Sequence, residues 1–452
     1  MKQKKYDVVI IGAGPGGHAV AEGVARAGKR VAIIERNGWG GTCTHRGCIP
    51  TKALLACSRQ LANLKKLKRL GVMTGEPTFD FAAMKRHQKQ MIAISALGVQ
   101  KSLKEAGVAM KAGSGKIISP GEVAWTSPEG DMQHLGAENI VIAWGSETLL
   151  LPGVTLSERI VTSDGFLTLD VLPKSVIIVG GSVIGVEFAT FLAELGVHVT
   201  IIELLDRLIP QEEEEATDLL KQELTRLGVA LYTGAKAETL EDRSGDVHLI
   251  ASQGAKQLDL TADYALICTG RKPLLHGDEL ERCGIAWHPK GIVVDEHQMT
   301  NIAGIYAIGD VTGGMMLAHR AMQQGKALAG YLSGDASFTC KEEAIPSVVY
   351  SHPNVARVGL TEREALAKGL TLEIRKADYA ANIIARTELK GNGFIKAVFC
   401  KEKLIGVTIA GEDASELIAS MSLAVSNSLS RKELKQWILP HPTLSEIFHS
   451  LT

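Results

Sequence analysis

A glycine-rich pattern occurs twice in the chain, each time between two apolar runs. The first copy, "YDVVIIGAGPGGHAVAEGVARAGKRVAIIER" (6–36), passes from a strand-length apolar run through Gly12, Gly14 and Gly17 into a helical period and then into a second apolar run. In such a βαβ unit the glycines permit a tight turn, close approach of the backbone to a pyrophosphate and close helix packing. Glu35 ends the second run and is suited to bind a ribose. The pattern predicts a dinucleotide site.

The second copy, "KSVIIVGGSVIGVEFATFLAELGVHVTIIEL" (174–204), overlays the first without a gap. Gly180, Gly185 and Glu203 fall at the offsets of the corresponding glycines and glutamate of the first copy. One copy alone is weak evidence, but two complete copies indicate that the chain binds two dinucleotides. Glu203 favours NAD over NADP at the second site, because a carboxylate there repels a 2′-phosphate.

The second copy departs from the first at Ser182, which stands where the first has Gly14. Its side chain could crowd the phosphate or could donate a hydrogen bond to it, and the sequence leaves both alternatives open. Arg207, shortly after Glu203, is interpreted as a surface charge and not as a phosphate ligand. The acidic run that follows, residues 211–228, is expected to be a solvated helix face with its charges at the helix start.

The length and the charge balance of the chain limit the kinds of protein that it can be. A chain of 452 residues is expected to form several domains, because a single core rarely grows past about 250–300 residues. The 49 basic and 50 acidic residues leave no excess charge for binding nucleic acid. The apolar run near the N-terminus is too short for a membrane span, and seven cysteines, an odd number, argue against a disulfide framework. We expect a cytoplasmic protein without a membrane span.

Two cysteines stand five positions apart in "GGTCTHRGCIPTK" (40–52). Five residues of ideal helix rise about 7.5 Å, beyond the roughly 7 Å between Cα atoms that a disulfide tolerates, so a Cys43–Cys48 bond needs distorted backbone. Gly47 permits this distortion, and Pro50 suits the first turn of a helix that begins near Cys48. A helix N-terminus lowers the pKa of a thiol, and Lys52 falls on the same helical face.

Two other interpretations of the cysteines remain open. Zinc would need four ligands, and Cys43, His45, Cys48 and Cys57 lack a recognised spacing. The pair could also be two reduced core residues. Redox chemistry between the two sulfurs is favoured, because the segment follows Glu35 by only a few residues and so lies next to a predicted dinucleotide.

Further motifs follow in a fixed order along the chain: "ENIVIAWGSETLLLPG" (138–153), "GGSVIGVEF" (180–188), "IYAIGDVTGGMMLAHRA" (305–321), "ASELIA" (414–419) and "HPTLSE" (441–446). With the first glycine pattern and the cysteine segment, this ordered set resembles the flavoprotein disulfide reductases over essentially the whole chain. The closest resemblance is to members that oxidise dihydrolipoyl dithiols.

The resemblance implies an α/β fold with two Rossmann-like dinucleotide-binding domains and a C-terminal α+β dimerisation domain, assembled as a homodimer. The expected segments are an FAD-binding domain over 1–145, an NAD-binding domain over 146–268, a return to the FAD-binding domain over 269–340 and an interface domain over 341–452. FAD and NAD are the implied cofactors, and no metal is implied.

The resemblance also assigns residues to each site. Cys48 would lie against the flavin and Cys43 would attack substrate sulfur, while Lys52 would pair with Glu187 near the flavin. The implied FAD residues are Gly12, Gly14, Gly17, Glu35, Thr42, Lys52, Gly115, Asp310 and Ala318. The implied NAD residues are Gly180, Gly185, Glu203 and Gly270.

His441 and Glu446 admit two interpretations. The spacing from Thr443 to Glu446 is that of a capping box, in which the glutamate only satisfies a backbone N–H at a helix start. The resemblance implies instead that His441 is the acid and base for the cysteines of the partner subunit, oriented by Glu446. A near-neutral imidazole suits the deprotonation of a thiol.

The implied reaction oxidises a dihydrolipoyl dithiol, small or carried on a protein, through the Cys43–Cys48 disulfide and FAD, and reduces NAD to NADH. The chain departs from the family pattern at His45, Trp144 and the Leu439-Pro440 pair. These departures leave an NADH-dependent reductase of another disulfide or low-molecular-weight thiol as an alternative. A non-catalytic, NADH-sensing flavoprotein subunit is the alternative from a different class.

Overall fold

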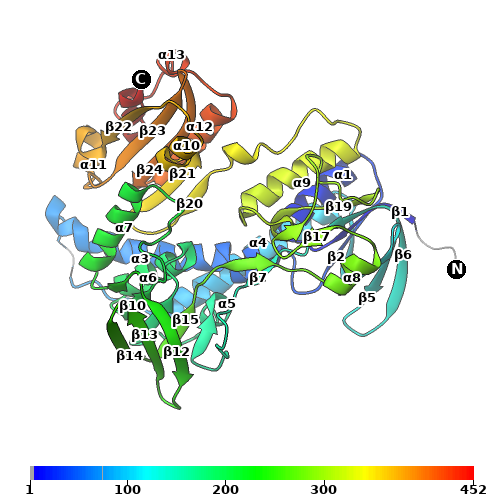
Figure 1. Ribbon diagram of the computed structural model, residues 1–452, viewed down its shortest axis with the longest axis horizontal. Helices are drawn as coiled ribbons and strands as arrows, with labels where there is room; N and C mark the ends of the chain where they lie inside the picture. Colours follow the sequence, from blue (N-terminus) through cyan, green and yellow to red (C-terminus); the bar gives the residue numbers. More distant parts are fainter. Residues whose placement is uncertain (1–4, 74) are drawn as a thin grey trace. The chain divides into compact units, whose positions relative to one another are not determined.

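The computed structural model describes residues 5–73 and 75–452, which form two compact units (Figure 1). The first unit comprises Met1–Ala53, Lys85–Leu149 and Arg271–Cys340. The second unit comprises Leu54–Met84, Leu150–Gly270 and Lys341–Thr452. The domain boundaries given from the sequence stay predictions.

The main sheet of the first unit is parallel at its centre. Its strand order is β3 (Ala109–Ala112), β2 (Val31–Glu35), β1 (Lys5–Ile11), β6 (Met132–Ile142), β5 (Glu122–Thr126) and β4 (Ser114–Ser119), with β19 (Ile305–Ala307) also on β6. The β1 strand pairs in parallel with β2 and β6, whereas β4, β5 and β6 are antiparallel. The apolar run from Val8 to Ile11 is buried, as expected for a central strand covered on both faces.

Two helices pack closely against each other in the first unit. Figure 1 shows α1 (Pro15–Arg26) beside α9 (Ala318–Leu332). Small residues make this approach possible, because a Cβ on Gly23 would lie 2.7 Å from the Ala329 Cβ and one on Gly325 would lie 2.6 Å from the Gly16 carbonyl oxygen. The other elements here are α2 (Gly41–Arg46), the start of α3 (Cys48–Leu67), most of α4 (Phe81–Glu105), β7 (Ser146–Thr148), β16 (Arg271–Pro273), α8 (Gly277–Arg282), β17 (Trp287–His288), β18 (Gly291–Ile292) and η2 (Gly309–Thr312).

The second unit contains a second parallel sheet. Its order is β11 (Ala230–Tyr232), β10 (His198–Ile202), β9 (Ser175–Val179), β15 (Tyr264–Ile267) and β8 (Ile160–Thr162). An antiparallel sheet of β12 (Lys236–Asp242), β13 (Val247–Gln253) and β14 (Lys256–Ala262) accompanies it. The helices of this part are α5 (Ser163–Phe166), α6 (Val183–Glu194) and α7 (Glu214–Arg226), with η1 (Lys68–Leu70) after α3.

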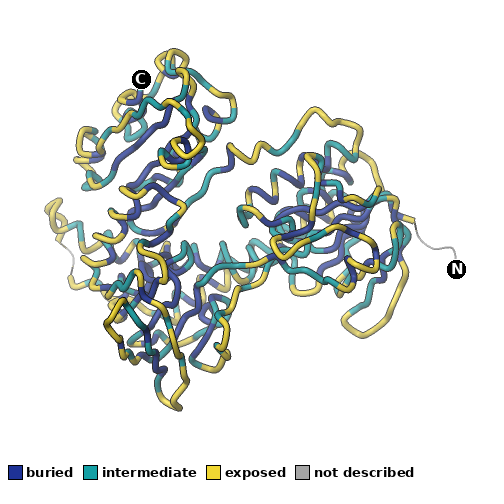
Figure 2. Tube along the Cα trace, in the orientation of Figure 1, coloured by how far each residue is buried: buried dark blue, intermediate teal, exposed yellow. Residues whose placement is uncertain are grey.

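The C-terminal part of the second unit is an antiparallel sheet covered by helices. The strand order is β20 (Ser347–Val349), β21 (Asn354–Gly359), β24 (Lys403–Gly411), β23 (Phe394–Cys400) and β22 (Glu373–Asp378). Its helical elements are η3 (Glu342–Ala344), α10 (Glu362–Ala367), η4 (Tyr379–Ala381), α11 (Ile383–Thr387), α12 (Ala414–Ser426), α13 (Arg431–Leu434) and η5 (Leu444–Leu451). In Figure 2 its inner strands are buried, whereas loops and helix edges are exposed.

The arrangement confirms the predicted fold class: two βαβ-based parallel sheets and a C-terminal α+β part. Within residues 5–73 and 75–452, no helix is both long enough and apolar enough to span a bilayer.

The acidic run was expected to be solvated, and for its first residues this is wrong. Glu212 and Glu213 are buried, with 5% and 6% of their surface exposed. Arg357 Nε lies 3.0 Å from a Glu212 carboxylate oxygen, and Lys396 Nζ lies 3.2 Å from one of Glu213. These cations come from β21 and β23, far along the chain, so a local charge pattern could not reveal them.

Candidate functional site

The first glycine-rich turn accepts only glycine at two positions. Gly12 has φ of 111°, and a Cβ there would lie 2.2 Å from the Ala143 carbonyl oxygen. A Cβ on Gly17 would lie 2.0 Å from the Gly12 oxygen. Gly14, at the start of α1, carries no capping side chain, and a Cβ there would meet nothing within 4 Å. The α1 N-terminus therefore has open space beside it, which fits the pyrophosphate of FAD.

Glu35 ties the turn to the loop that follows β2. Its carboxylate accepts hydrogen bonds from Ala13 N at 2.8 Å, Asn37 N at 2.7 Å and Gly38 N at 3.2 Å. A carboxylate offers about four acceptor positions, so one remains for a ribose hydroxyl.

The cysteine segment packs directly on this turn. Gly40 N donates to the Ala13 oxygen at 3.0 Å, and a Cβ on Gly41 would lie 2.8 Å from Gly14 Cα. Cys43 lies in α2, beside Thr42, and Cys48 is the first residue of α3. Gly47 alone separates the two helices. The two sulfurs are therefore carried on separate helix ends, next to the place where a dinucleotide fits.

Cys43 and Cys48 are half-buried thiols that interact with each other. A hydrogen bond from the Cys43 thiol to Cys48, together with burial, raises the pKa of Cys43, while the charge of Lys52 acts in the opposite direction. Burial also raises the pKa of Cys57, further along α3. As for zinc, the described part of the chain gathers no three His, Cys, Asp or Glu side chains in a metal-binding group.

The remaining residues implied for FAD lie in the same unit. A Cβ on Gly115 of β4 would be 2.9 Å from Ile34 Cδ1, so β4 passes close to the end of β2. Asp310 lies on η2, and Ala318 begins α9.

A polar contact at Asp310 was missed from the sequence. Ser146 Oγ donates to Asp310 Oδ2 at 2.6 Å and accepts from Arg271 Nε at 2.8 Å. Ser146 lies on β7 and Arg271 on β16, two antiparallel paired strands at which the chain leaves the first unit and returns to it. The sequence signal that could have revealed this contact is that Ser146 and Arg271 stand next to the two points where the chain crosses between the units.

The second glycine-rich turn repeats the first. Gly180 has φ of 110°, and its Cβ would lie 2.4 Å from the Cys268 oxygen, while a Cβ on Gly185 would lie 2.1 Å from the Gly180 oxygen. Glu203 accepts from Gly181 N at 2.5 Å and from Leu205 N at 2.7 Å. Gly270 follows β15 with φ of 115°, and a Cβ there would meet nothing within 4 Å. This turn fits the pyrophosphate of NAD.

Ser182 begins α6 with φ and ψ of −72° and 174°, close to the −65° and −178° of Gly14. Its hydroxyl oxygen accepts a hydrogen bond from Gly185 N at 3.3 Å. Arg207 is turned to the chain itself, because it donates to the Pro210 oxygen and, at 3.4 Å, to the Glu212 oxygen. Its guanidinium is thus engaged in a local turn, in line with its interpretation as a residue that does not read phosphate.

Glu187 lies buried in α6, and one of its carboxylate oxygens accepts from Tyr350 N at 3.0 Å. Lys52 belongs to the first unit and Glu187 to the second. Their pairing stays a prediction.

His441 and Glu446 form a dyad at the chain's C-terminal end. His441 Nδ1 lies 2.8 Å from Glu446 Oε1, and the imidazole side chain is 76% exposed. Glu446 Oε2 accepts from Thr443 N at 2.9 Å. This backbone hydrogen bond, followed by the one to His441, lowers the pKa of Glu446. The two interpretations of Glu446 are therefore compatible, because one oxygen caps the turn and the other binds the imidazole.

Two departures from the family pattern have local explanations. His45 Nε2 lies 3.1 Å from the Trp39 carbonyl oxygen, so the ring bridges α2 to the loop after β2. Trp144 packs edge-on against His276 with ring centres 4.7 Å apart. Its buried Nε1 meets no hydrogen-bond acceptor among the described residues.

Comparison with known proteins agrees with this geometry. The profile of the pyridine nucleotide-disulphide oxidoreductases matches residues 6–325, and the dimerisation domain of the same family matches residues 345–452. A dihydrolipoyl dehydrogenase from Chlorobaculum tepidum is 36% identical over 446 residues, covering 98% of this chain and 95% of the relative. The dimerisation domain supports the predicted homodimer.

Solved structures show the same likeness. LpdA from Mycobacterium tuberculosis has a TM-score of 0.92 at 27% identity, covering 99% of this chain and 98% of that one. RclA from Escherichia coli, an HOCl-induced flavoprotein disulfide reductase solved as a Cu(II) complex, has a TM-score of 0.88 at 28% identity, covering 99% of both chains. The chain belongs to the pyridine nucleotide-disulphide oxidoreductase family and is an NAD-dependent flavoenzyme that uses FAD and acts on disulfides.

Proposed function

We propose that this enzyme is a dihydrolipoyl dehydrogenase, which oxidises a dihydrolipoyl dithiol and reduces NAD. The observation that carries the proposal is the contact between the Cys43 and Cys48 thiols, on helix ends packed against the first glycine-rich turn. The name and high coverage of the relative from Chlorobaculum tepidum support the choice of dithiol.

The proposed exchange begins with the Cys43–Cys48 disulfide. One substrate thiolate attacks Cys43, forming a mixed disulfide as the bond to Cys48 breaks and Cys48 leaves as a thiolate. The second substrate thiol then displaces Cys43, so the substrate leaves as a disulfide. FAD, when bound, carries the two electrons from the cysteine pair to NAD. The raised pKa of Cys43, caused by its hydrogen bond with Cys48 and by burial, favours the protonated form of Cys43 in the reduced pair.

His441 is proposed to accept the proton of the attacking substrate thiol. Glu446 Oε1 at 2.8 Å orients the imidazole. The 76% exposure of the His441 side chain suits a group that acts at the cysteines of a partner subunit.

Serine substitutions test the cysteine assignment. We expect Cys43→Ser and Cys48→Ser to lower the steady-state rate with dihydrolipoamide and NAD by at least about a thousandfold, because each removes one sulfur of the exchange. Cys57→Ser is the matched control on α3 and should keep the wild-type rate. Lipoamide turnover at the wild-type rate in Cys43→Ser would rule out the assignment.

A second candidate is an NADH-dependent reductase of another disulfide. The structural match to RclA, a flavoprotein disulfide reductase, covers as much of this chain as the match to LpdA does. The segment before His441 also presents an unusual surface, since Ile438 is 91% exposed and Pro440 precedes the histidine. Turnover with NADH or NADPH against lipoamide, cystine, glutathione disulfide and coenzyme A disulfide separates the candidates: dominant lipoamide turnover supports the first.

A further inference from the structure

We propose that Asn382 is a positioning residue for His441, acting through the Thr443 backbone and the Glu446 carboxylate. This inference rests on the proposed function, because it takes His441 to move the proton of the dithiol step. Neither the resemblance nor the motif set pointed to Asn382, which lies some 60 residues before the dyad in the sequence.

Both polar atoms of the Asn382 side chain form hydrogen bonds. Its Oδ1 caps α11 by accepting from Ile384 N and Ala385 N, each at 3.0 Å. Its Nδ2 donates to the Thr443 oxygen at 3.0 Å and to the Leu444 oxygen at 3.5 Å. An asparagine amide has one acceptor oxygen and two N–H donors, so the side chain joins α11 to the start of η5 with its full hydrogen-bonding capacity.

A continuous path of hydrogen bonds leads from the Asn382 side chain to the His441 imidazole. Asn382 binds the carbonyl of Thr443, whose N–H binds Glu446 Oε2 at 2.9 Å. Glu446 Oε1 then binds His441 Nδ1 at 2.8 Å. Thr443 Oγ1 also donates to the Pro440 oxygen at 2.8 Å, which closes the turn around the histidine.

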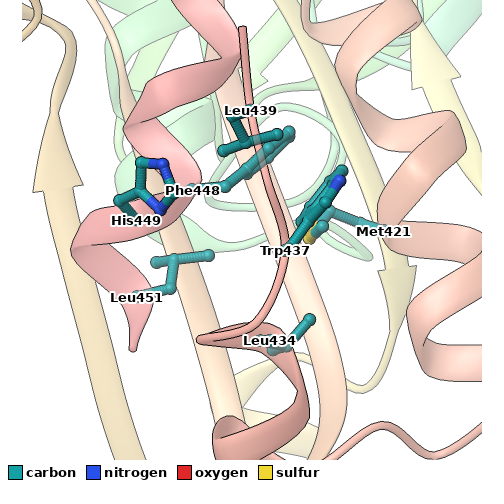
Figure 3. Close-up of a pocket in the computed structure, with 7 residues that line it drawn as sticks. All are labelled: Met421, Leu434, Trp437, Leu439, Phe448, His449 and Leu451. Atoms are coloured by element: carbon teal, nitrogen blue, oxygen red, sulfur yellow. The ribbon is translucent and has the colours of Figure 1, made fainter.

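The preceding segment is held by apolar packing instead. Figure 3 shows Trp437 and Leu439 turned into a pocket together with Phe448. The Trp437 and Phe448 rings stack with centres 5.2 Å apart and planes 14° apart. This pocket anchors the backbone on both sides of His441, but the imidazole itself is 76% exposed. Its orientation therefore depends on the hydrogen-bond path and not on packing.

The orientation matters because proton transfer depends steeply on geometry. A misplacement of about 1 Å can cost about a hundredfold in rate. Loss of the Asn382 donor leaves the Thr443 carbonyl with the longer hydrogen bond from Glu446 N at 3.4 Å, and so loosens the position of the Thr443 N–H that holds Glu446. The expected defect is confined to the dithiol step, because transfer from NADH to the flavin does not use His441.

Asn382→Asp separates the two functions of the side chain, which are donation to the Thr443 and Leu444 carbonyls and capping of α11. Aspartate caps helices as well as asparagine does, but an ionised carboxylate donates no hydrogen bond to the Thr443 or Leu444 carbonyl. Asn382→Ser makes the same separation without adding charge. Thr361→Ala is the matched control, because it removes the capping box of α10, a helix of the same C-terminal part, at a comparable cost in stability.

Rapid mixing of the holoenzyme measures the two half-reactions separately. We expect Asn382→Asp and Asn382→Ser to slow reduction by dihydrolipoamide about ten- to a hundredfold, to change its pH profile and to leave flavin reduction by NADH unchanged. Thr361→Ala should leave both half-reactions and the pH profile as in the wild type.

His441→Gln distinguishes failure of the inference from failure of the proposed function. If His441→Gln slows the dithiol step while both Asn382 variants react at the wild-type rate, the positioning role is wrong. If the Asn382 variants slow both half-reactions equally, Asn382 is only structural and the inference is likewise overturned. If His441→Gln itself reacts with dihydrolipoamide at the wild-type rate, the role of His441 is wrong and the positioning role of Asn382 falls with it, whereas a wild-type enzyme that does not react with dihydrolipoamide would overturn the proposed function.

Discussion

Ser182 and Gly14 show how one side chain can distinguish two sites built on the same backbone. Both residues begin a helix after a glycine-rich turn, and their φ and ψ values nearly coincide. Only Ser182 brings a side chain, whose oxygen accepts from Gly185 N. Because that oxygen accepts from Gly185 N, the hydroxyl keeps its own hydrogen for donation to a phosphate. Of the two alternatives left by the sequence, the geometry favours donation over crowding.

Ser182→Gly tests this assignment. We expect the affinity for NAD to fall about fivefold, the effect of one lost hydrogen bond, while FAD content stays at the wild-type level. A glycine cap costs α6 only a few tenths of a kcal/mol compared with serine, so the fold should persist. Isothermal titration of the FAD-loaded enzyme with NAD gives the dissociation constant. Tighter binding by Ser182→Gly would mean that the side chain crowds the phosphate.

The start of α7 shows, at the scale of an element, how a charged segment becomes an interior contact. Lys396 on β23 is 6% exposed at its side chain and lies 2.5 Å from Glu362, 3.2 Å from Glu213 and 3.7 Å from Glu215. Glu213 begins α7, so its charge also suits the helix N-terminus. The acidic run is thereby fastened to the antiparallel C-terminal sheet.

Removing the buried cation should be costly. We expect Lys396→Met to lower the free energy of unfolding by about 3–5 kcal/mol, because it leaves the buried Glu213 carboxylate without its main partner. Lys396→Met combined with Glu213→Gln should recover part of this loss. Lys403→Met is the control, because the Lys403–Glu433 pair is about half exposed and should contribute little to stability. Urea unfolding at pH 7 measures all three; equal losses for Lys396→Met and Lys403→Met would contradict the prediction.

The sequence predicted the parts of this protein that depend on local pattern. Both βαβ units, their glycines and the need for distorted backbone near Gly47 follow from spacing, because the sterics of a turn act on neighbouring residues. The resemblance supplied the cofactors and the dyad. The contacts of Asn382 and Ser146 were missed, because each side chain binds a residue more than 50 positions away. The burial of Glu213 was misjudged for the same reason.

At the scale of the molecule, His352 contacts carboxylates from distant parts of the chain, all within the second unit. Its ring nitrogens lie 2.7 Å from Glu194, at the end of α6, and 3.1 Å from Glu412, after β24. Burial lowers the pKa of His352, but the hydrogen bonds to the two carboxylates outweigh burial and leave the pKa raised. Burial likewise opposes the charged form of Glu412, yet His352, with Lys66 and Arg59, lowers the pKa of Glu412 to about 2.

His352→Gln should therefore cost most in mildly acidic solution. A raised histidine pKa stabilises the fold fully below the unfolded value of about 6.5, and this contribution is lost as the pH rises through the folded pKa. The lowered Glu412 pKa stabilises the fold above about pH 4.5 and fails as the pH falls towards 2. Both contributions coincide between about pH 5 and 6.5, where we expect a loss of about 2 kcal/mol or more. Chemical unfolding at pH 5.5 and pH 9 measures it; a loss that does not shrink at pH 9 would contradict the charge argument.

The single glycine between α2 and α3 has a consequence for the speed of repeated turnover. The helical break at Gly47 is already present in the dithiol form, and the Cys43 thiol is already hydrogen-bonded to Cys48. Each catalytic cycle can then open and close the bridge by rotating side chains, with both helices left wound. Reorganisation of the backbone need not limit how fast this enzyme cycles.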